Sequence, residues 1–330
     1  MNRNPLRRPR PHRRRSLLAA SALVAAAAAL GPSLSACTSG SGDGPGGGTH
    51  LVRTAMGEVK VKKHPQRVVV LDTAELDSAV TLGIRPAGAT RADTATGFPE
   101  HLPAESVRGT ADVGRIGAPD LEAVAALKPD LILTNKDRDA QRYDQLSKIA
   151  PTVMTAATGY PWKDNFRTHA EALGKTSEAR KAVAAYETHA REVTEALGGT
   201  ERAAALKVNV VRFVEGAAIR IYGRKNFIGT VLQDAGVGRP GVVDRARDGF
   251  SYDVGPEQID QADADALFTS VYGNPDRARV PRTTGSALWK GMKAVREGRT
   301  FKVDDRLWIQ GIGYTAAHRI LDELRAHLAD

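Results

Sequence analysis

The sequence predicts an α/β protein built from two lobes that one long helix joins. Short β-branched runs alternate with helical segments toward both ends of the chain, which favours parallel α/β units. The alternation stops in the middle, where residues 162–197 have a helical pattern only. A weak internal repeat on each side of this helical stretch supports two similarly built lobes.

The first lobe begins with a strand and a helix. Arg67–Leu71 is a short apolar run typical of a buried strand, and Asp72–Glu75 opens a helix that ends at Gly83. A helix at 119–127 and a strand at 130–133 continue the same alternation.

Two helices are predicted in the middle of the chain, at 162–173 and 176–197. The second has apolar residues on one stripe and ends at Gly198-Gly199. Its 22 residues span about 33 Å at 1.5 Å per residue, which suits a packing helix or a rigid strut between lobes. A hairpin of strands at 207–214 and 217–222 and a last helix at 315–328 are predicted beyond it.

The internal repeat consists of a proline, a glutamate and an aspartate at similar spacing in each copy. Pro119 and Pro256 each start a predicted helix, and in both copies a glutamate precedes an aspartate by eight residues. The glutamates are Glu122 and Glu257.

The charge of the chain is concentrated in its leader. The 330 residues carry a formal net charge of +9, but the first 36 hold seven arginines and no acidic residue. From residue 37 onward, 40 basic residues face 38 acidic ones, so the body is nearly neutral and no nucleic-acid partner is predicted. The composition also excludes a mainly disordered or multi-span membrane protein.

Residues 1–36 have the pattern of a signal peptide. The arginines precede a 14-residue apolar run, Leu17–Leu30, which is shorter than a membrane-spanning helix requires. Leu34–Cys37 is similar to a bacterial lipobox, and Arg14–Leu18 resembles a twin-arginine export motif, so Sec and Tat export both remain open.

Cys37 is the single cysteine, and we interpret it as the lipidation site. A buried structural thiol is the alternative. However, Cys37 lies between the apolar run and a Gly/Ser-rich tract at 38–48 that has nothing to pack. The sequence therefore predicts an exported protein held by acylation on the outer face of the cytoplasmic membrane.

A set of ordered motifs resembles the substrate-binding lipoproteins of bacterial ABC importers for ferric siderophores. The matching stretches, from about residue 58 to the end of the chain, are 65–71 with 82–88, 112–114 with 119–122 and 127–132, 288–290 with 294–299 and 303–304, and 316–317 with 321–324. The resemblance implies the class III substrate-binding protein fold, in which two Rossmann-like lobes are joined by a single long helix. It divides the chain into a signal peptide (1–36), a lipidated linker (37–50), an N-terminal lobe (51–160), a helical connector (161–199) and a C-terminal lobe (200–330).

The resemblance also implies a function. Such a protein captures a ferric siderophore as its ligand, needs no cofactor, works as a monomer, and delivers the ligand to the permease subunits. Glu122 and Glu257 are similar in placement to the family's permease-docking glutamates, one on each lobe; the alternative is that each only stabilises a helix N-terminus.

Ligand-binding residues are expected just after strands or in loops that lead into helices, where open α/β sheets bind ligands, and three further candidates lie on the predicted hairpin at 207–222. Arginines would donate to oxygen atoms around a ferric centre, and aromatic rings would cover apolar spacers. The alternatives are solvated or ion-paired arginines and core aromatics. The candidates are Arg115, Arg138, Arg212, Arg220, Tyr222, Tyr252 and Trp308.

The ligand class is less constrained. Residues 212–213, 220–223 and 227–229 resemble family members that take hydroxamate or mixed citrate–hydroxamate siderophores, although several arginines also suit a catecholate. Haem and vitamin B12 are alternatives, but the eight histidines show no ligand spacing and no metal site is expected. An enzyme or a surface adhesin belongs to a different class. The chain has no G-x-S-x-G, P-loop or H-E-x-x-H motif, so no enzyme is predicted.

Overall fold

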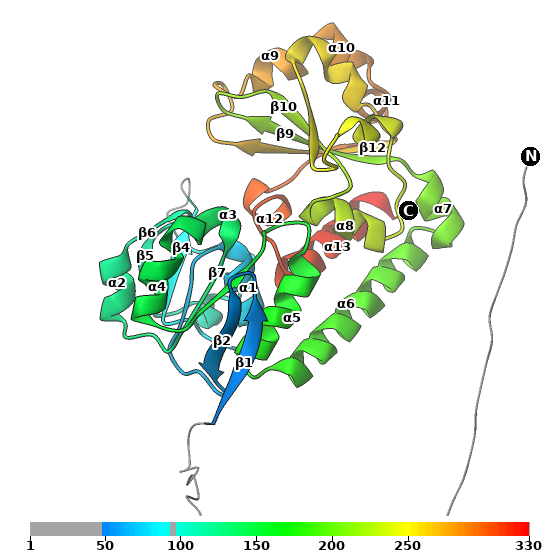
Figure 1. Ribbon diagram of the computed structural model, residues 1–330. Coiled ribbons are helices and arrows are strands. Elements are labelled where there is room, and N and C mark those ends of the chain that lie inside the picture. The colour runs from blue at the N-terminus through cyan, green and yellow to red at the C-terminus, as the bar shows by residue number, and fades with distance from the viewer. Residues whose placement is uncertain (1–47, 93–96, 330) are drawn as a thin grey trace, which may run out of the picture. The chain divides into compact units, whose positions relative to one another are not determined.

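Two large β-sheets, one in each lobe, form the framework of the described chain, and the long helix α6 (Thr176–Ala196) runs from one lobe to the other (Figure 1). The computed structural model describes residues 48–92 and 97–329. Within these ranges, none of the helices combines the length and the apolar character needed to cross a membrane.

The N-terminal lobe contains a six-stranded sheet with the order β6-β5-β4-β3-β7-β8. All neighbours are parallel except β5 and β6. Its central strands are apolar and buried, as expected where helices cover both faces. The strands are β3 (Val68–Val70), β4 (Gly88–Arg91), β5 (Ala111–Arg115), β6 (Ala118–Pro119), β7 (Leu131–Asn135) and β8 (Thr152–Thr155).

The predicted helix at 119–127 is shorter in the structure. Pro119 belongs to β6, and the helix α2 begins at Leu121 because the Asp120 carboxylate accepts hydrogen bonds from the backbone N–H groups of Glu122 and Ala123. The other helices of this lobe are α1 (Thr73–Thr81), η1 (Ala104–Ser106), α3 (Lys136–Asp139), η2 (Ala140–Arg142) and α4 (Tyr143–Ile149), and α2 ends at Ala126.

A hairpin that the sequence analysis did not predict precedes this sheet. Its antiparallel strands are β1 (Thr49–Thr54) and β2 (Gly57–Lys62). The backbone N–H of Ala55 donates to the carbonyl of Met154 on β8, so the hairpin is attached to the edge of the lobe.

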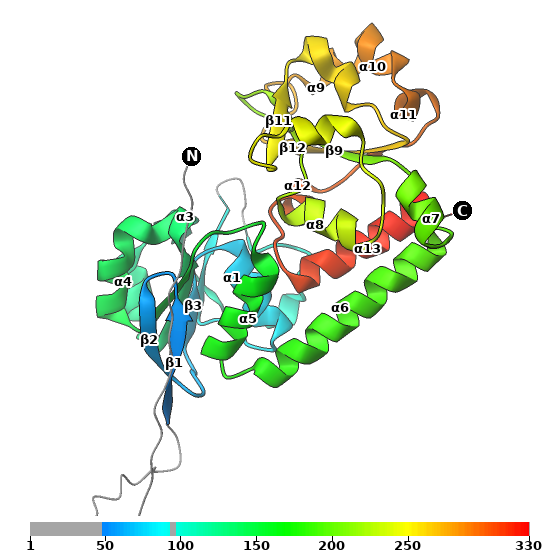
Figure 2. The same ribbon diagram turned by 45° about the vertical axis from the view of Figure 1, so that its right-hand side comes forward.

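The two helices predicted at 162–173 and 176–197 are present as α5 (Trp162–Ala172) and α6. Helix α6 packs against the last helix, α13 (Tyr314–Leu328) (Figure 2). The backbone of Gly198 and Gly199 has positive φ angles of 92° and 85°, which end α6 as predicted. A further short helix that was not predicted, α7 (Gly199–Ala205), follows directly.

The C-terminal lobe contains a five-stranded sheet with the order β11-β10-β9-β12-β13. Its strands are β9 (Val208–Val214), β10 (Ile219–Tyr222), β11 (Ser251–Val254), β12 (Ala266–Tyr272) and β13 (Thr300–Lys302). The predicted hairpin is confirmed, since β9 and β10 are antiparallel with Arg212 opposite Arg220. The helices are α8 (Phe227–Asp234), η3 (Gly241–Arg245), η4 (Pro256–Ala262), α9 (Val280–Thr284), α10 (Ala287–Gly291), α11 (Lys293–Arg296) and α12 (Asp305–Trp308).

Four aromatic rings from four helices meet between the lobes. Trp162 of α5 lies 4.6 Å from Tyr314 of α13 and 5.3 Å from Phe227 of α8, measured between ring centroids. Tyr186 of α6 packs edge-on against both Trp162 and Tyr314. Two polar atoms of this cluster have partners, because Trp162 Nε1 donates to Thr230 Oγ1 and the Tyr186 hydroxyl donates to Asp234.

The first turn of α13 is capped by a side chain from another helix. Asp77 of α1 is buried, and its carboxylate accepts hydrogen bonds of 3.0 Å from the backbone N–H groups of both Thr315 and Ala316. A Cβ atom at Gly313 would lie 2.1 Å from Asp77 Oδ1, so this approach requires glycine. Asp77 therefore attaches the last helix of the chain to the N-terminal lobe.

Replacing Asp77 with Ala should destabilise the protein by about 2–3 kcal/mol, because two buried N–H groups lose their acceptor. Asp77→Asn keeps one acceptor oxygen and should cost less. Urea unfolding measures both effects, with Asp164→Ala as the control, since Asp164 is exposed on α5. An Asp77→Ala variant as stable as the control would show that the cap contributes nothing.

Candidate functional site

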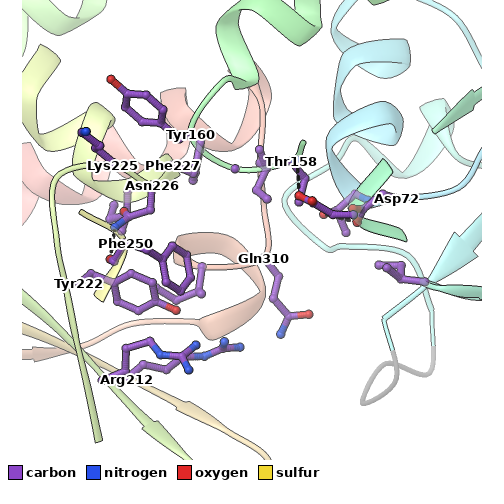
Figure 3. A pocket seen from close by; sticks show the side chains of 18 of the residues that line it. Asp72, Thr158, Tyr160, Arg212, Tyr222, Lys225, Asn226, Phe227, Phe250 and Gln310 are labelled. Carbon is purple, nitrogen blue, oxygen red and sulfur yellow. Dashed lines mark hydrogen bonds between the residues drawn. The ribbon is translucent and has the colours of Figure 1, made fainter. Parts of the chain in front are cut away.

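A cavity of about 480 Å³ lies between the two sheets and takes its wall from both lobes (Figure 3). Its N-terminal side contains Asp72, Thr73, Ile116, Asp137, Arg138, Thr158, Gly159 and Tyr160. Its C-terminal side contains Arg212, Arg220, Tyr222, Lys225, Asn226, Phe227, Ile228 and Phe250, and the segment before α13 adds Ile309, Gln310 and Ile312.

The N-terminal wall is built by residues that follow parallel strands. Asp72 comes just after β3, Arg138 follows β7, and Thr158–Tyr160 follow β8. Because these strands run in the same direction, their carboxyl ends meet at one edge of the sheet. The topology thus gathers distant parts of the chain at the cavity.

The C-terminal wall depends on the alternation of side chains along β10. Arg220 and Tyr222 line the cavity, whereas Ile221 between them is buried in the core of the lobe. Arg212 lies opposite Arg220 across the antiparallel pair and so shares its face. Two guanidinium groups and one phenol therefore face the same space.

Arg212 is fixed by a bidentate ion pair. Its Nε and Nη2 atoms donate to the two oxygens of Asp305 at 2.6 and 2.5 Å, and its guanidinium lies over the Tyr272 ring at 4.6 Å. Burial alone would lower the pKa of Arg212, but the Asp305 carboxylate holds it above its usual value. Arg212 is thus a permanent, oriented donor.

Aromatic rings accompany these cations. Tyr222 and Phe250 (Figure 3) pack edge to face with centroids 5.7 Å apart. The Arg220 guanidinium lies 5.5 Å from the centroid of the Phe250 ring. Tyr160, 52% exposed, lines the cavity from the N-terminal side. The wall combines N–H donors with exposed ring surface, so it suits a ligand that has oxygen acceptors and apolar segments.

A buried polar cluster lies beneath the N-terminal wall. The Asn135 amide donates to Asp72 Oδ2 and Glu75 Oε1, and Arg138 Nε donates to Asp72 Oδ2 at 2.9 Å. Glu75 is fully buried, and its Oε2 has no hydrogen-bond partner in the described part of the chain. Burial, together with the Asp72 charge, raises the pKa of Glu75 to about 8, so Glu75 is mostly neutral at pH 7. Asp72 is then the carboxylate that balances Arg138.

Four of the seven predicted ligand-binding residues line the cavity: Arg138, Arg212, Arg220 and Tyr222. Arg115 does not, and its Nη1 donates to the carbonyl of Ala92. Tyr252 lies opposite Ile221 in the sheet, so it shares the core face and packs under Arg245 instead.

Trp308 is a core residue. Its side chain is completely buried, stacks on Phe268 at 4.5 Å, and donates from Nε1 to Glu323. Trp308 does not line the cavity, so the predicted ligand contact is not seen. Its side chain packs in the C-terminal lobe instead.

The other predicted functional residues lie away from the cavity. Glu122 on α2 and Glu257 on η4 are exposed, one on each lobe. Neither has an ion-pair partner within residues 48–92 and 97–329, and the cap of α2 is already supplied by Asp120. Cys37 lies outside the described residues.

Sequence reasoning missed several wall residues, including Asp72, Tyr160, Lys225, Phe250 and Gln310. Asp72 was expected only as part of a helix start, although its place directly after a strand could have indicated the site. The loops that carry Tyr160 and Phe250 have no periodic pattern, so only the folded chain places their rings. In the ranges that the structure describes, no three His, Cys, Asp or Glu side chains gather closely enough to hold a metal ion.

Replacing Glu75 with Gln should remove a pH dependence of stability. A carboxyl whose pKa is raised to about 8 on folding, from about 4.3 unfolded, holds an extra proton in the native state between these values. The free energy of unfolding then falls as pH rises through that window, by at most about 1.4 kcal/mol per pH unit.

The contribution of Glu75 to the pH dependence of the unfolding free energy is measured best by urea unfolding between about pH 6.5 and 8. Burial lowers the pKa of His169 to about 3, so His169 makes stability rise with pH below about 6.5 and has no effect above it. Glu105→Gln, an exposed substitution, is the control. Parallel stability curves for wild type and Glu75→Gln would contradict a proton on buried Glu75.

Comparison with known proteins places the chain among binding proteins. A family model described as periplasmic binding protein matches residues 68–307. The probable siderophore-binding lipoprotein YfiY of Bacillus subtilis is 33% identical over 290 residues, which cover 84% of this chain and 87% of that protein. The Fe(3+)-citrate-binding protein YfmC of the same organism is 30% identical and covers 87% of this chain and 88% of its own length.

A solved structure agrees with the fold. SirA of Staphylococcus aureus, crystallised with staphyloferrin B, superposes with a TM-score of 0.76 at 31% sequence identity, covering 85% of this chain and 98% of SirA. The expected two-lobed α/β architecture with one long linking helix is therefore confirmed. On the family match and these relatives, the chain belongs to the periplasmic binding protein family.

Proposed function

We propose that this protein is the extracytoplasmic solute-binding component of an ABC importer and that it captures a ferric siderophore in the cavity between its lobes. The observation that carries the proposal is the cavity wall, in which Arg138, Arg212 and Arg220 supply N–H donors beside the rings of Tyr222 and Phe250. The names of two relatives, a probable siderophore-binding lipoprotein and an Fe(3+)-citrate-binding protein, support the same class of ligand.

The role is binding and delivery rather than catalysis. In this proposal the mature protein is a monomer that is lipidated at Cys37 and held on the outer face of the cytoplasmic membrane, in keeping with the relatives that are named lipoproteins. The ligand is a hydroxamate or mixed citrate–hydroxamate complex, as the resemblance of residues 212–229 implies.

Ligand capture should be visible through tryptophan fluorescence. Trp162 packs against Phe227, and Phe227 lines the cavity, so occupancy should change the emission of Trp162. Titrating the soluble form that begins after Cys37 with a ferric trihydroxamate, a ferric tris-catecholate, haem and vitamin B12 should give saturation by a ferric siderophore, after correction for ligand absorbance. Arg220→Gln should weaken that binding about tenfold, the value of one charged hydrogen bond.

The matched control is Arg167→Gln, because Arg167 is also ion-paired but lies on α5 outside the cavity wall. Saturation by haem or vitamin B12 alone would replace the ligand class within the same family. If none of the four ligands binds, the importer role itself fails and a surface adhesin or an enzyme becomes the better hypothesis.

Glu122 and Glu257 are proposed to dock the protein on the permease. Each is an exposed carboxylate on a different lobe, and carboxylates pair directionally with arginines. Replacing both with Ala should abolish uptake of the ferric ligand by cells while ligand affinity, measured by fluorescence, stays within twofold.

The control for docking is the double variant Glu105→Ala and Glu201→Ala, which removes one exposed glutamate from each half of the chain at other positions. It should transport normally. Loss of ligand affinity in the Glu122 and Glu257 variant, or normal uptake by it, would contradict the docking role.

A further inference from the structure

Each arginine in the cavity wall carries an aspartate of its own. Arg138 Nε lies 2.9 Å from Asp72 Oδ2, Arg212 is held by Asp305 in the bidentate pair, and Arg220 Nε lies 3.4 Å from Asp253 Oδ1. The arginines are therefore present as ion pairs rather than as isolated cations.

Two of these pairs are firmly built. The side chains of Asp72 and Asp305 are 1% and 7% exposed. Asp305 also accepts hydrogen bonds from Ser270 Oγ and Gln310 Nε2, at 2.9 and 2.7 Å. Moving the arginine away from either aspartate would leave an uncompensated charge in a buried place. A ligand must bind these arginines with their aspartates still in place.

The rest of the wall adds no net charge. Lys225 has no ion-pair partner in the described part of the chain, and Asp137 on the opposite side is exposed and accepts a hydrogen bond from the Thr158 N–H. The wall and its directly paired carboxylates thus contain four cations, Arg138, Arg212, Arg220 and Lys225, and four anions, Asp72, Asp137, Asp253 and Asp305.

This balance distinguishes between classes of ferric complex. A tris-catecholate complex carries about three negative charges, and desolvating them against a neutral wall is unfavourable because no net positive charge replaces the lost hydration. A trihydroxamate complex is neutral, and a mixed citrate–hydroxamate complex carries little charge. Both complexes can still accept hydrogen bonds from the remaining arginine N–H groups and pack on the aromatic rings. Neither complex has the free-energy cost of desolvating a trianion.

We infer that the cavity is selective for a ferric complex of low net charge, between zero and one negative, and that the aspartates paired to its arginines set this selectivity. The inference rests on the proposed function and narrows it. In this view Asp72, Asp253 and Asp305 are specificity residues that act through the arginines they neutralise.

The direct test compares ferrichrome, a neutral ferric trihydroxamate, with ferric enterobactin, a trianionic tris-catecholate. Wild-type protein should bind the neutral complex at least about 100-fold more tightly than the trianion. The dissociation constant for the neutral complex should hardly change between about 50 and 500 mM salt, because salt does not screen an uncharged ligand. Tighter binding of the trianion would overturn the charge inference and leave siderophore capture intact. Binding of neither complex would overturn the proposed function itself.

A second test separates charge from ligand shape. Asp253 is half-exposed, so Asp253→Asn should fold normally, and it removes one negative charge from the cavity rim. Its dissociation constant for the trianion should fall about fivefold relative to that for the neutral complex, and high salt should remove the difference. Using the ratio of the two constants cancels any general loss of binding.

The matched control is Asp244→Asn. Asp244 is an exposed aspartate of the same lobe that pairs with Arg224 at 2.8 Å, and neither residue lines the cavity. In Asp244→Asn, the ratio of the dissociation constants for the trianionic and the neutral complex should stay within about twofold of the wild-type ratio. An unchanged ratio in Asp253→Asn, or an equal change in both variants, would show that the paired aspartates do not set the selectivity.

Discussion

The cavity depends on the packing of four aromatic rings between the lobes. Trp162, Tyr186, Phe227 and Tyr314 come from α5, α6, α8 and α13, so each ring anchors a different helix in one buried cluster. Aromatic packing of this kind combines a large buried area with a defined geometry. Since Phe227 also lines the cavity, the cluster that fixes the connector helices also supports part of the ligand wall.

This arrangement suits capture without extensive rearrangement. Two arginines of the wall, Arg138 and Arg212, are already oriented, because each is bonded to a buried aspartate. A preorganised donor loses little conformational entropy when a ligand arrives. The same ion pairs lower the net charge of the site, so the features that orient the donors also influence which ligand charge the site accepts.

Much of the fold was predictable because it follows from local patterns. The long helix was predicted from its apolar stripe and the Gly198-Gly199 stop, and the β9–β10 hairpin from two apolar runs around a short turn. The start of α2 was not predictable, because it depends on the Asp120 cap and on the pairing of Pro119 in β6 with the neighbouring strand β5. The capping of α13 by Asp77 joins residues more than 230 positions apart, and no local pattern contains it.

The residues of the candidate site also fall into two groups, those that the sequence indicated and those that only the folded chain places. The sequence by itself determined that Arg138 follows a strand and that Arg212, Arg220 and Tyr222 lie on one hairpin, and so it indicated these four residues as members of the wall. Only the tertiary structure decided that Tyr252 and Trp308 face the core and that Phe250 and Tyr160 face the cavity. It also decided which aspartate neutralises each arginine. The reason is physical: strand position is a local property of the chain, whereas the facing of a side chain and its charge partner depend on which distant strands pair and in what register.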